Sequence, residues 1–120
     1  MDVFCKIMNG DIPSFTLYED DVVKVFLDVN PETNGHTLVV PKEHYTDLFD
    51  IKDDVLAHIF NVAKKMNDLF KEKLNSDGLT LVQNNGIAQE VKHFHLHLIP
   101  QYGYKQELVE VEDVYHQLTD

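Results

Sequence analysis

The sequence predicts an α+β fold, in which about five antiparallel strands pack with one long helix and one or two short ones. Residues 53–74 carry apolar side chains at helical spacing, whereas several short stretches before and after them have the composition of strands. These strands do not alternate with helices as they would in a parallel sheet, so an antiparallel arrangement is favoured. At 120 residues, the chain is expected to form a single domain over residues 1–120.

The long helix is predicted from apolar residues that recur every three or four positions, which places them on one face. Asp53 and Asp54 begin the segment and Lys71 and Lys73 lie near its end, an order that complements the helix dipole. The turn-forming residues 75–78 end it. The apolar face consists of Val55, Leu56, Ile59, Phe60, Ala63, Met66, Leu69 and Phe70.

Short alternating or β-rich segments predict the strands, and the two chain ends favour short helices. Asp20 and Asp21 form a plausible tight connection between the first two strands. A helical turn is expected over residues 3–8, and apolar spacing in residues 111–118 is compatible with a short closing helix. The strands are expected over residues 15–19, 22–28, 36–40, 79–83 and 93–101.

The composition argues against two classes of binding partner, nucleic acids and membranes. The formal charge is −11, with 21 acidic and 10 basic residues and no arginine, so we expect no binding to nucleic-acid backbones. No apolar run approaches the roughly 20 residues of a membrane helix, so no membrane association is expected. Cys5 is the single cysteine, and the first residues lack the features of a secretory signal, which favours a cytoplasmic protein.

Three histidines at every second position, His93, His95 and His97, form the most informative motif. On a strand they project from one face, while the apolar residues between them project from the other. Three roles remain open at this point: catalysis or anion binding, metal ligation, and none. Cα atoms four residues apart on a strand are separated by roughly 13 Å, so two neighbouring imidazoles could share an ion, but convergence of all three is not expected.

The segment His-Phe-His-Leu-His-Leu-Ile, residues 93–99, resembles the motif of the histidine triad (HIT) family, in particular its Hint- and Fhit-like branch of nucleotide hydrolases and transferases. Further stretches resemble the family in the same order along the chain. The match runs from about residue 3 to residue 103, and residues 104–120 form a C-terminal tail. The additional matching stretches are residues 4–7, 11–13, 26–31 and 35–44, together with Asn84-Asn85-Gly86 and Gln89.

The resemblance implies cleavage at the α-phosphorus of adenosine or other purine 5′-phosphoramidates, adenylates or dinucleoside polyphosphates. His95 would attack phosphorus and form a nucleotidyl-histidine intermediate, from which water releases the nucleoside monophosphate. His97 would bind a phosphate oxygen and protonate the leaving group. His36 would contact the same region, or it could instead be a strand-end histidine bonded to backbone. An imidazole suits the nucleophile, because a substantial neutral fraction exists at pH 7. Its attacking nitrogen needs a free lone pair, so the other should donate hydrogen, often to a backbone carbonyl.

The resemblance also implies a nucleotide-binding set. Asp28 would accept hydrogen bonds from ribose hydroxyls, and the side-chain amides of Asn84 and Gln89 would contact phosphate. Asp28 could instead cap its turn, the two amides could cap a loop, and the apolar residues could be ordinary core. The apolar positions expected to line a base pocket are Val3, Phe4, Ile7, Phe26 and Val29.

The chain departs from the family pattern before the triad. Residues 86–90 are about two residues shorter than the usual glycine-rich loop, and Glu90 stands where Ser or Thr is common. A carboxylate facing the phosphate would repel it, so we expect Glu90 either to turn outward or to favour a substrate with a cationic leaving portion.

A structural zinc ion is the one metal that the resemblance suggests; the chemistry itself needs no cofactor. Asp2, Cys5, His44 and His93 occupy the positions where many bacterial members hold zinc, and Asp is a competent ligand. Cys5 could equally be a small buried apolar residue. The family also implies a homodimer. Two rival functions remain: a nucleotide-binding module without turnover, and a zinc-binding domain that uses Cys5, His44 and His93.

Overall fold

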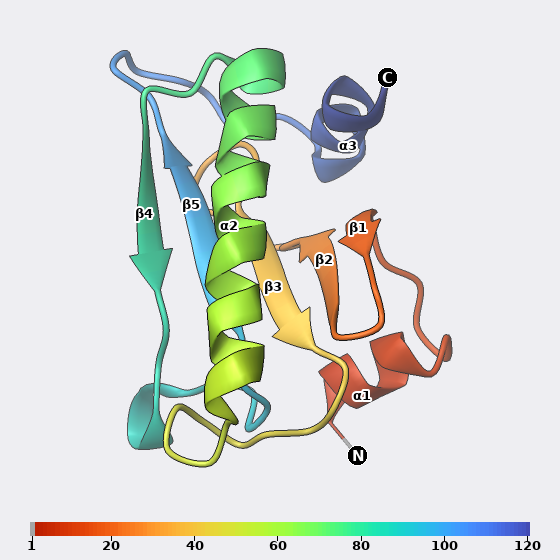
Figure 1. Cartoon of the computed structure of the whole chain (residues 1–120). Coiled ribbons are helices and arrows are strands. Elements are labelled where there is room, and N and C mark those ends of the chain that lie inside the picture. The colour runs from red at the N-terminus through yellow and green to blue at the C-terminus, as the bar shows by residue number, and fades with distance from the viewer. Residues whose placement is uncertain (1) are drawn as a thin grey trace.

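The computed structural model describes residues 2–120 and contains a five-stranded antiparallel sheet in the order β1-β2-β3-β5-β4 (Figure 1). This confirms the predicted α+β fold with one long and two short α-helices among the described residues. The strands are β1 (Thr16–Glu19), β2 (Val23–Leu27), β3 (Thr37–Pro41), β4 (Gly78–Val82) and β5 (Leu96–Gln101). The helices are α1 (Val3–Met8), α2 (Asp53–Leu74) and α3 (Val111–Thr119), with a 3-10 turn, η1, at Gly86–Ala88.

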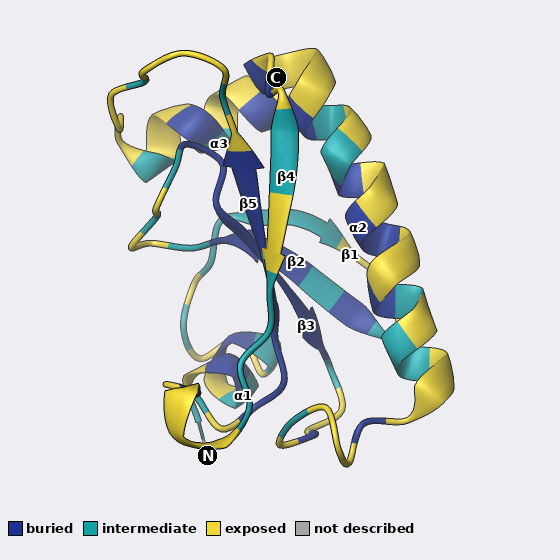
Figure 2. Cartoon of the chain, turned by 90° about the vertical axis from the view of Figure 1, so that its left-hand side faces the viewer, coloured by how far each residue is buried: buried dark blue, intermediate teal, exposed yellow. Residues whose placement is uncertain are grey.

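The helix α2 spans the predicted residues and lies along one face of the sheet (Figure 1). Its buried positions alternate with exposed ones along the helix (Figure 2), as its apolar spacing predicts, but Phe60, predicted on the apolar face, is 43% exposed. It ends at Asn75, whose left-handed conformation (φ 56°) is one that asparagine tolerates better than most residues. Within the part of the chain that the structure describes, no helix has both the length and the apolarity needed to cross a membrane.

Strand alternation divides the core between the two faces of the sheet. Val23, Val25 and Leu27 of β2 pack in the main core with α2, whereas Phe26 points to the opposite face. A second, smaller cluster on that face joins α1 to the sheet. It consists of Phe4, Ile7, Phe26, Leu38 and Val40. Because α1 is short, it covers this face only in part, which leaves room for a cavity.

The fifth strand is shorter than predicted. It begins at Leu96, whereas the sequence pattern predicted His93. The N–H of Phe94 donates to the carbonyl of Tyr45 (2.7 Å), in the loop after β3, so this segment leaves the ladder. Pro41 at the end of β3 lacks an N–H, and its carbonyl accepts a hydrogen bond from His93 Nε2 (2.9 Å). The other four strands match their predicted bounds to within one residue.

Candidate active site and candidate metal centre

A cavity of about 670 Å³ lies over the sheet face opposite α2. Its floor includes a row of residues that pair across four strands: Phe26 with Leu38, Leu38 with His97, and His97 with Val82. Helix α1 contributes Phe4 and Ile7 to its wall. A cavity of this size, apolar on its floor and with a few convergent polar groups, suits a small organic ligand.

His95 lies just before β5, lines the cavity and is only 6% exposed. Its Nδ1–H donates to the carbonyl of His93 (2.7 Å), which leaves a lone pair on Nε2 and confirms the predicted bond to backbone. Burial lowers the pKa of His95 and outweighs the hydrogen bond to the His93 carbonyl, which raises it; repulsion from the His93 ring lowers the pKa further. The imidazole is therefore neutral at pH 7, the form a nucleophile requires.

His36 and His97 form a hydrogen-bonded chain in the same cavity. The backbone N–H of Glu32 donates to His36 Nδ1 (3.0 Å), so the proton of a neutral His36 is on Nε2. That nitrogen lies 2.9 Å from His97 Nδ1 and donates to it. His97 then carries its own proton on Nε2. A backbone amide thus sets the tautomers of two side chains.

Burial is the main cause of the lowered pKa values in this hydrogen-bonded pair of histidines. Burial lowers the pKa of His97 to about 4, with smaller contributions from His95 and His36. Burial also lowers the pKa of His36, although the carboxylates of Asp28 and Glu32 oppose this. The rings of His95 and His97 lie with centroids 4.9 Å apart. One cavity therefore places a ring nitrogen with a lone pair beside a residue whose neutral ring carries an N–H.

The structure brings most of the predicted nucleotide-binding residues to this cavity. Asp28 and Asn84 line it, as do all five apolar residues predicted for the base pocket, although Val29 is 66% exposed. Asp28 also accepts a hydrogen bond from the N–H of Asn30 (2.9 Å), so it caps its turn as well. Glu90 is exposed at the cavity.

Gln89 does not reach the cavity lining. Its side chain is buried and its amide donates to the carbonyl of Thr46, which ties the loop before the triad to the loop after β3. The side-chain oxygen of Gln89, Oε1, is buried and has no hydrogen-bond partner among the described residues.

Sequence reasoning missed several groups that shape the cavity. The backbone N–H of Glu32, which donates to His36, could not be predicted from the side-chain pattern, because any residue except proline supplies such a group. Strand alternation could have identified Ile99, which lies two residues after His97 on β5, and Val82, which pairs with His97 across the strands. The lining residues not predicted are Ile12, Pro13, Ser14, Phe15, Leu27, Asn30, Glu32, Leu38, Val82, Ala88, Val91 and Ile99.

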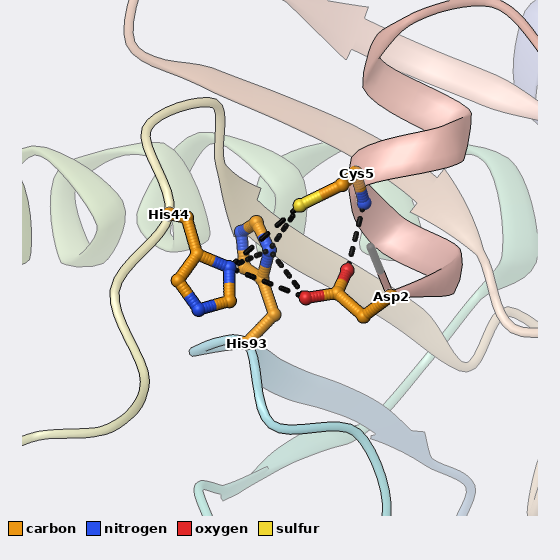
Figure 3. Close-up of side chains that lie close together, drawn as sticks. All are labelled: Asp2, Cys5, His44 and His93. Carbon is orange, nitrogen blue, oxygen red and sulfur yellow. Dashed lines mark hydrogen bonds and ion pairs between the residues drawn. The ribbon is translucent and has the colours of Figure 1, made fainter.

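A second cluster joins Asp2, Cys5, His44 and His93, and none of these residues lines the cavity (Figure 3). The Nδ1 atoms of His44 and His93 are 3.2 Å apart, and Asp2 Oδ2 lies 3.2 and 3.4 Å from them. Cys5 Sγ lies 3.7 and 3.6 Å from the same two nitrogens.

These distances fit a tetrahedral metal site. Zinc bonds of about 2.0–2.3 Å give ligand separations of about 3.3 Å between nitrogen and oxygen atoms and about 3.6 Å between sulfur and nitrogen. His93 Nε2–H donates to the Pro41 carbonyl, so its Nδ1 lone pair faces the cluster. One carboxylate, one thiol and two imidazoles form a donor set that zinc accepts. His93, fully buried, thus points to a different site from His95 and His97.

Comparison with known proteins identifies the family. Three alternating histidines at the start of β5, two of which line the cavity, are typical of a histidine triad protein, and the HIT domain model matches residues 9–104. The chain therefore belongs to the HIT family. An uncharacterised HIT-like protein of Methanocaldococcus jannaschii is 47% identical over 116 residues, which cover 95% of this chain and 89% of that protein.

Two further relatives bear on the two clusters. The adenosine 5′-monophosphoramidase of Candida albicans is 44% identical over 104 residues, covering 82% of this chain and 68% of that protein. The crystal structure of a zinc-bound histidine triad protein from Mycobacterium smegmatis has a TM-score of 0.89 at 35% identity, covering 97% of this chain and 88% of that chain.

Proposed function

We propose that this protein hydrolyses nucleotides at the α-phosphorus through a nucleotidyl-His95 intermediate. The substrates are adenosine or other purine 5′-phosphoramidates, adenylates or dinucleoside polyphosphates, and the product is the nucleoside monophosphate. The observation that carries the proposal is the pair of tautomers in one cavity: a lone pair on His95 Nε2 beside a His97 whose proton is on Nε2. The phosphoramidase activity for which the Candida relative is named is consistent with it.

The reaction has two displacements. In the first, the lone pair of His95 Nε2 forms a bond to phosphorus while the bond from phosphorus to the leaving nitrogen or oxygen breaks. His97 Nε2–H donates a hydrogen bond to a phosphate oxygen and passes its proton to the leaving group, and the negative charge left on the His36–His97 pair offsets the positive charge of the His95 adduct. In the second, water attacks phosphorus and the bond between phosphorus and His95 breaks. One proton of the water returns to the His36–His97 pair. The two steps together convert substrate and water into leaving group and nucleoside monophosphate.

The residues that line the cavity divide the binding work. The Asp28 carboxylate accepts hydrogen bonds from ribose hydroxyls, and the Asn84 amide donates to phosphate. Since no lysine lines the described part of the cavity and the chain has no arginine, neutral donors stabilise the phosphate. The purine base packs among apolar side chains of α1 and β2. They are Val3, Phe4, Ile7, Phe26 and Val29.

Asp2, Cys5, His44 and His93 would hold a structural zinc ion, which ties together the start of α1, the loop after β3 and the segment before β5. Zinc supplies cross-linking here, and no chemical step needs it, because its ligands lie outside the cavity. Metal analysis of freshly purified protein tests this: we expect one zinc per chain in the wild type and none in His44→Gln. We also propose that the protein is a cytoplasmic homodimer. Sedimentation velocity tests its oligomeric state.

The test of the reaction is to trap the intermediate. The protein is mixed with adenosine phosphoramidate, an aminoacyl adenylate or a diadenosine polyphosphate, quenched within milliseconds and analysed by intact mass. We expect an adenylyl adduct in the wild type and in His116→Gln, a matched control because His116 is exposed on α3, outside both clusters. His95→Ala should show no adduct and no product.

Other outcomes identify the rival functions. Nucleotide binding without adduct or product would indicate a binding module that lacks turnover. Zinc binding without nucleotide affinity would indicate a metal-binding domain.

A further inference from the structure

His93 takes part in both clusters, through different atoms. Its side-chain Nδ1 faces Asp2 and His44 at 3.4 and 3.2 Å, within the metal cluster. Its backbone carbonyl accepts the hydrogen bond from His95 Nδ1 (2.7 Å) that leaves a lone pair on the proposed nucleophilic nitrogen. Any shift of His93 therefore moves the acceptor that orients His95.

Helix α1 provides a second connection between the clusters, because its first turn carries Cys5 of the metal cluster (Figure 3) and Phe4 of the cavity. Asp2 Oδ1 accepts the N–H of Cys5 (2.8 Å) and caps the helix, while Asp2 Oδ2 faces the two imidazoles of the metal cluster. Between these two residues lies Phe4, whose ring packs against His95 with centroids 4.9 Å apart at an interplanar angle of 71°. The same ring contacts His93 at 5.9 Å.

The geometry of the metal cluster suits a bound cation, which would hold its four side chains together. Two imidazole nitrogens 3.2 Å apart, with a carboxylate and a sulfur atom beside them, direct their electron pairs at one point. A cation at that point is attracted by all four groups at once, whereas without it hydrogen bonds and ion pairs join these groups only two at a time. Helix α1 has six residues, fewer than an isolated helix needs, so it depends on its anchors.

We propose that metal occupancy of the Asp2–Cys5–His44–His93 site positions the His95 imidazole and closes the base wall formed by α1, so that metal and nucleotide bind with positive coupling. His93 is then a positioning residue, and Phe4 transmits the state of the metal site to the cavity. This inference rests on the proposed nucleotide function and on the proposed metal ion. Because no metal ligand lines the cavity, the coupling passes through the protein.

A thermodynamic cycle tests the coupling without measuring turnover. The affinity for AMP is measured by calorimetry on zinc-free protein and on protein loaded with one equivalent of zinc. The affinity for zinc is measured by competition with a chromophoric chelator, with and without saturating AMP. We expect each ligand to tighten the other by about tenfold, and by the same factor in both directions, because linkage is reciprocal.

Matched variants separate coupling from general damage. Asp2→Asn keeps a helix-capping oxygen but loses the anionic ligand, and His44→Gln alters a half-exposed side chain. Both should bind AMP as zinc-free wild type does and should not respond to zinc. Phe4→Leu should still bind zinc, but its coupling factor should fall to about threefold or less. His116→Gln should keep the full factor.

The outcomes divide cleanly. Equal AMP affinities with and without zinc, or zinc affinity unchanged by AMP, would overturn the coupling, as would failure to bind either ligand. A protein that forms the adenylyl adduct yet shows no coupling keeps the proposed hydrolase and loses this inference. Zinc-dependent AMP affinity without any adduct would do the opposite.

Discussion

The metal cluster and the cavity use the imidazole side chain in opposite ways, although residues 93–95 contribute to both. In the metal cluster, the Nδ1 atoms of His44 and His93 face each other at 3.2 Å. In the cavity, each Nδ1 is bonded within the protein: His95 donates to a carbonyl, His36 accepts from a backbone N–H, and His97 accepts from His36. The first arrangement offers lone pairs to a cation, and the second fixes tautomers for proton transfer.

Burial does not distinguish the two neighbouring histidines, because His93 is 0% and His95 6% exposed. Both rings meet a backbone carbonyl, and what differs is the ring nitrogen that donates to it. A carbonyl at Nε2 of His93 turns Nδ1 toward metal ligands, whereas a carbonyl at Nδ1 of His95 leaves the lone pair on Nε2. The partner of one ring nitrogen therefore decides the work of the other.

The largest expected effect separates the clusters directly. His95→Asn should lower kcat by at least about 10⁴-fold, because no other group can form the intermediate, while zinc content stays at one per chain. His44→Gln should lose the zinc but keep measurable turnover. Steady-state kinetics and metal analysis on the same preparations check both. Retained turnover in His95→Asn would remove the distinction between the clusters.

His97 should have a smaller effect that depends on the leaving group. His97→Asn should lower kcat by about 10²–10³-fold for an amine leaving group, which must be protonated to depart. For a p-nitrophenyl ester of AMP, whose leaving group needs no proton, the loss should be at most about tenfold. The two substrates are compared in one assay. Equal losses on both would assign His97 to phosphate binding alone.

Metal removal should lower thermal stability through one cluster only. Zinc in large excess over its dissociation constant stabilises the folded state by about 4 kcal/mol, which corresponds to about 10 °C or more in Tm for a domain of this size. Differential scanning calorimetry with and without a chelator should show this difference in the wild type and in His95→Asn. The same chelator should leave the Tm of His44→Gln unchanged; a shift there would place the metal elsewhere.

The smallest expected effect is on the pH dependence of stability. Burial lowers the folded-state pKa of His97 to about 4, from the ordinary value of 6.5. Below pH 6.5 the unfolded chain binds a proton that the folded chain refuses, so the free energy of unfolding falls as pH drops from 6.5 toward 4. The lowered pKa values of His36 and His95 act in the same direction.

Urea unfolding of metal-free protein at pH 7 and pH 5 measures this dependence. In His97→Asn, about 1 kcal/mol of the loss between these pH values should disappear, a figure reduced for partial exposure to solvent. The wild type and His116→Gln should lose stability equally. An unchanged pH dependence in His97→Asn would show that this imidazole does not resist protonation in the folded state.

Periodicity was sufficient to predict most of the fold, but it could not predict where the last strand begins. Helix α2 matches residues 53–74 because its apolar spacing is a local property. The start of β5 depends on the carbonyls of Pro41 and Tyr45, about 50 residues away, which accept hydrogen bonds from His93 and Phe94 in place of ladder partners. Alternation alone carries no information about such distant partners.

The candidate site shows the same limit. The resemblance to the family led to His36, His95 and His97 and to the four metal-cluster residues, which the structure does bring together. It also led to Gln89, whose side chain turns to Thr46 instead of the cavity. The tautomers depend on backbone atoms of Glu32 and His93, and backbone atoms are the same in every sequence, so their placement needs the folded chain.

A crystal structure of the zinc-loaded protein with AMP tests the central claim most directly. We expect His95 Nε2 about 3–3.5 Å from phosphorus, in line with the departing position, and His97 Nε2 on a phosphate oxygen. Zinc should be bound by Asp2, Cys5, His44 and His93, with His95 Nδ1 still on the His93 carbonyl. A His95 ring turned away from the phosphate, or a phosphate bound at the metal cluster, would contradict the account.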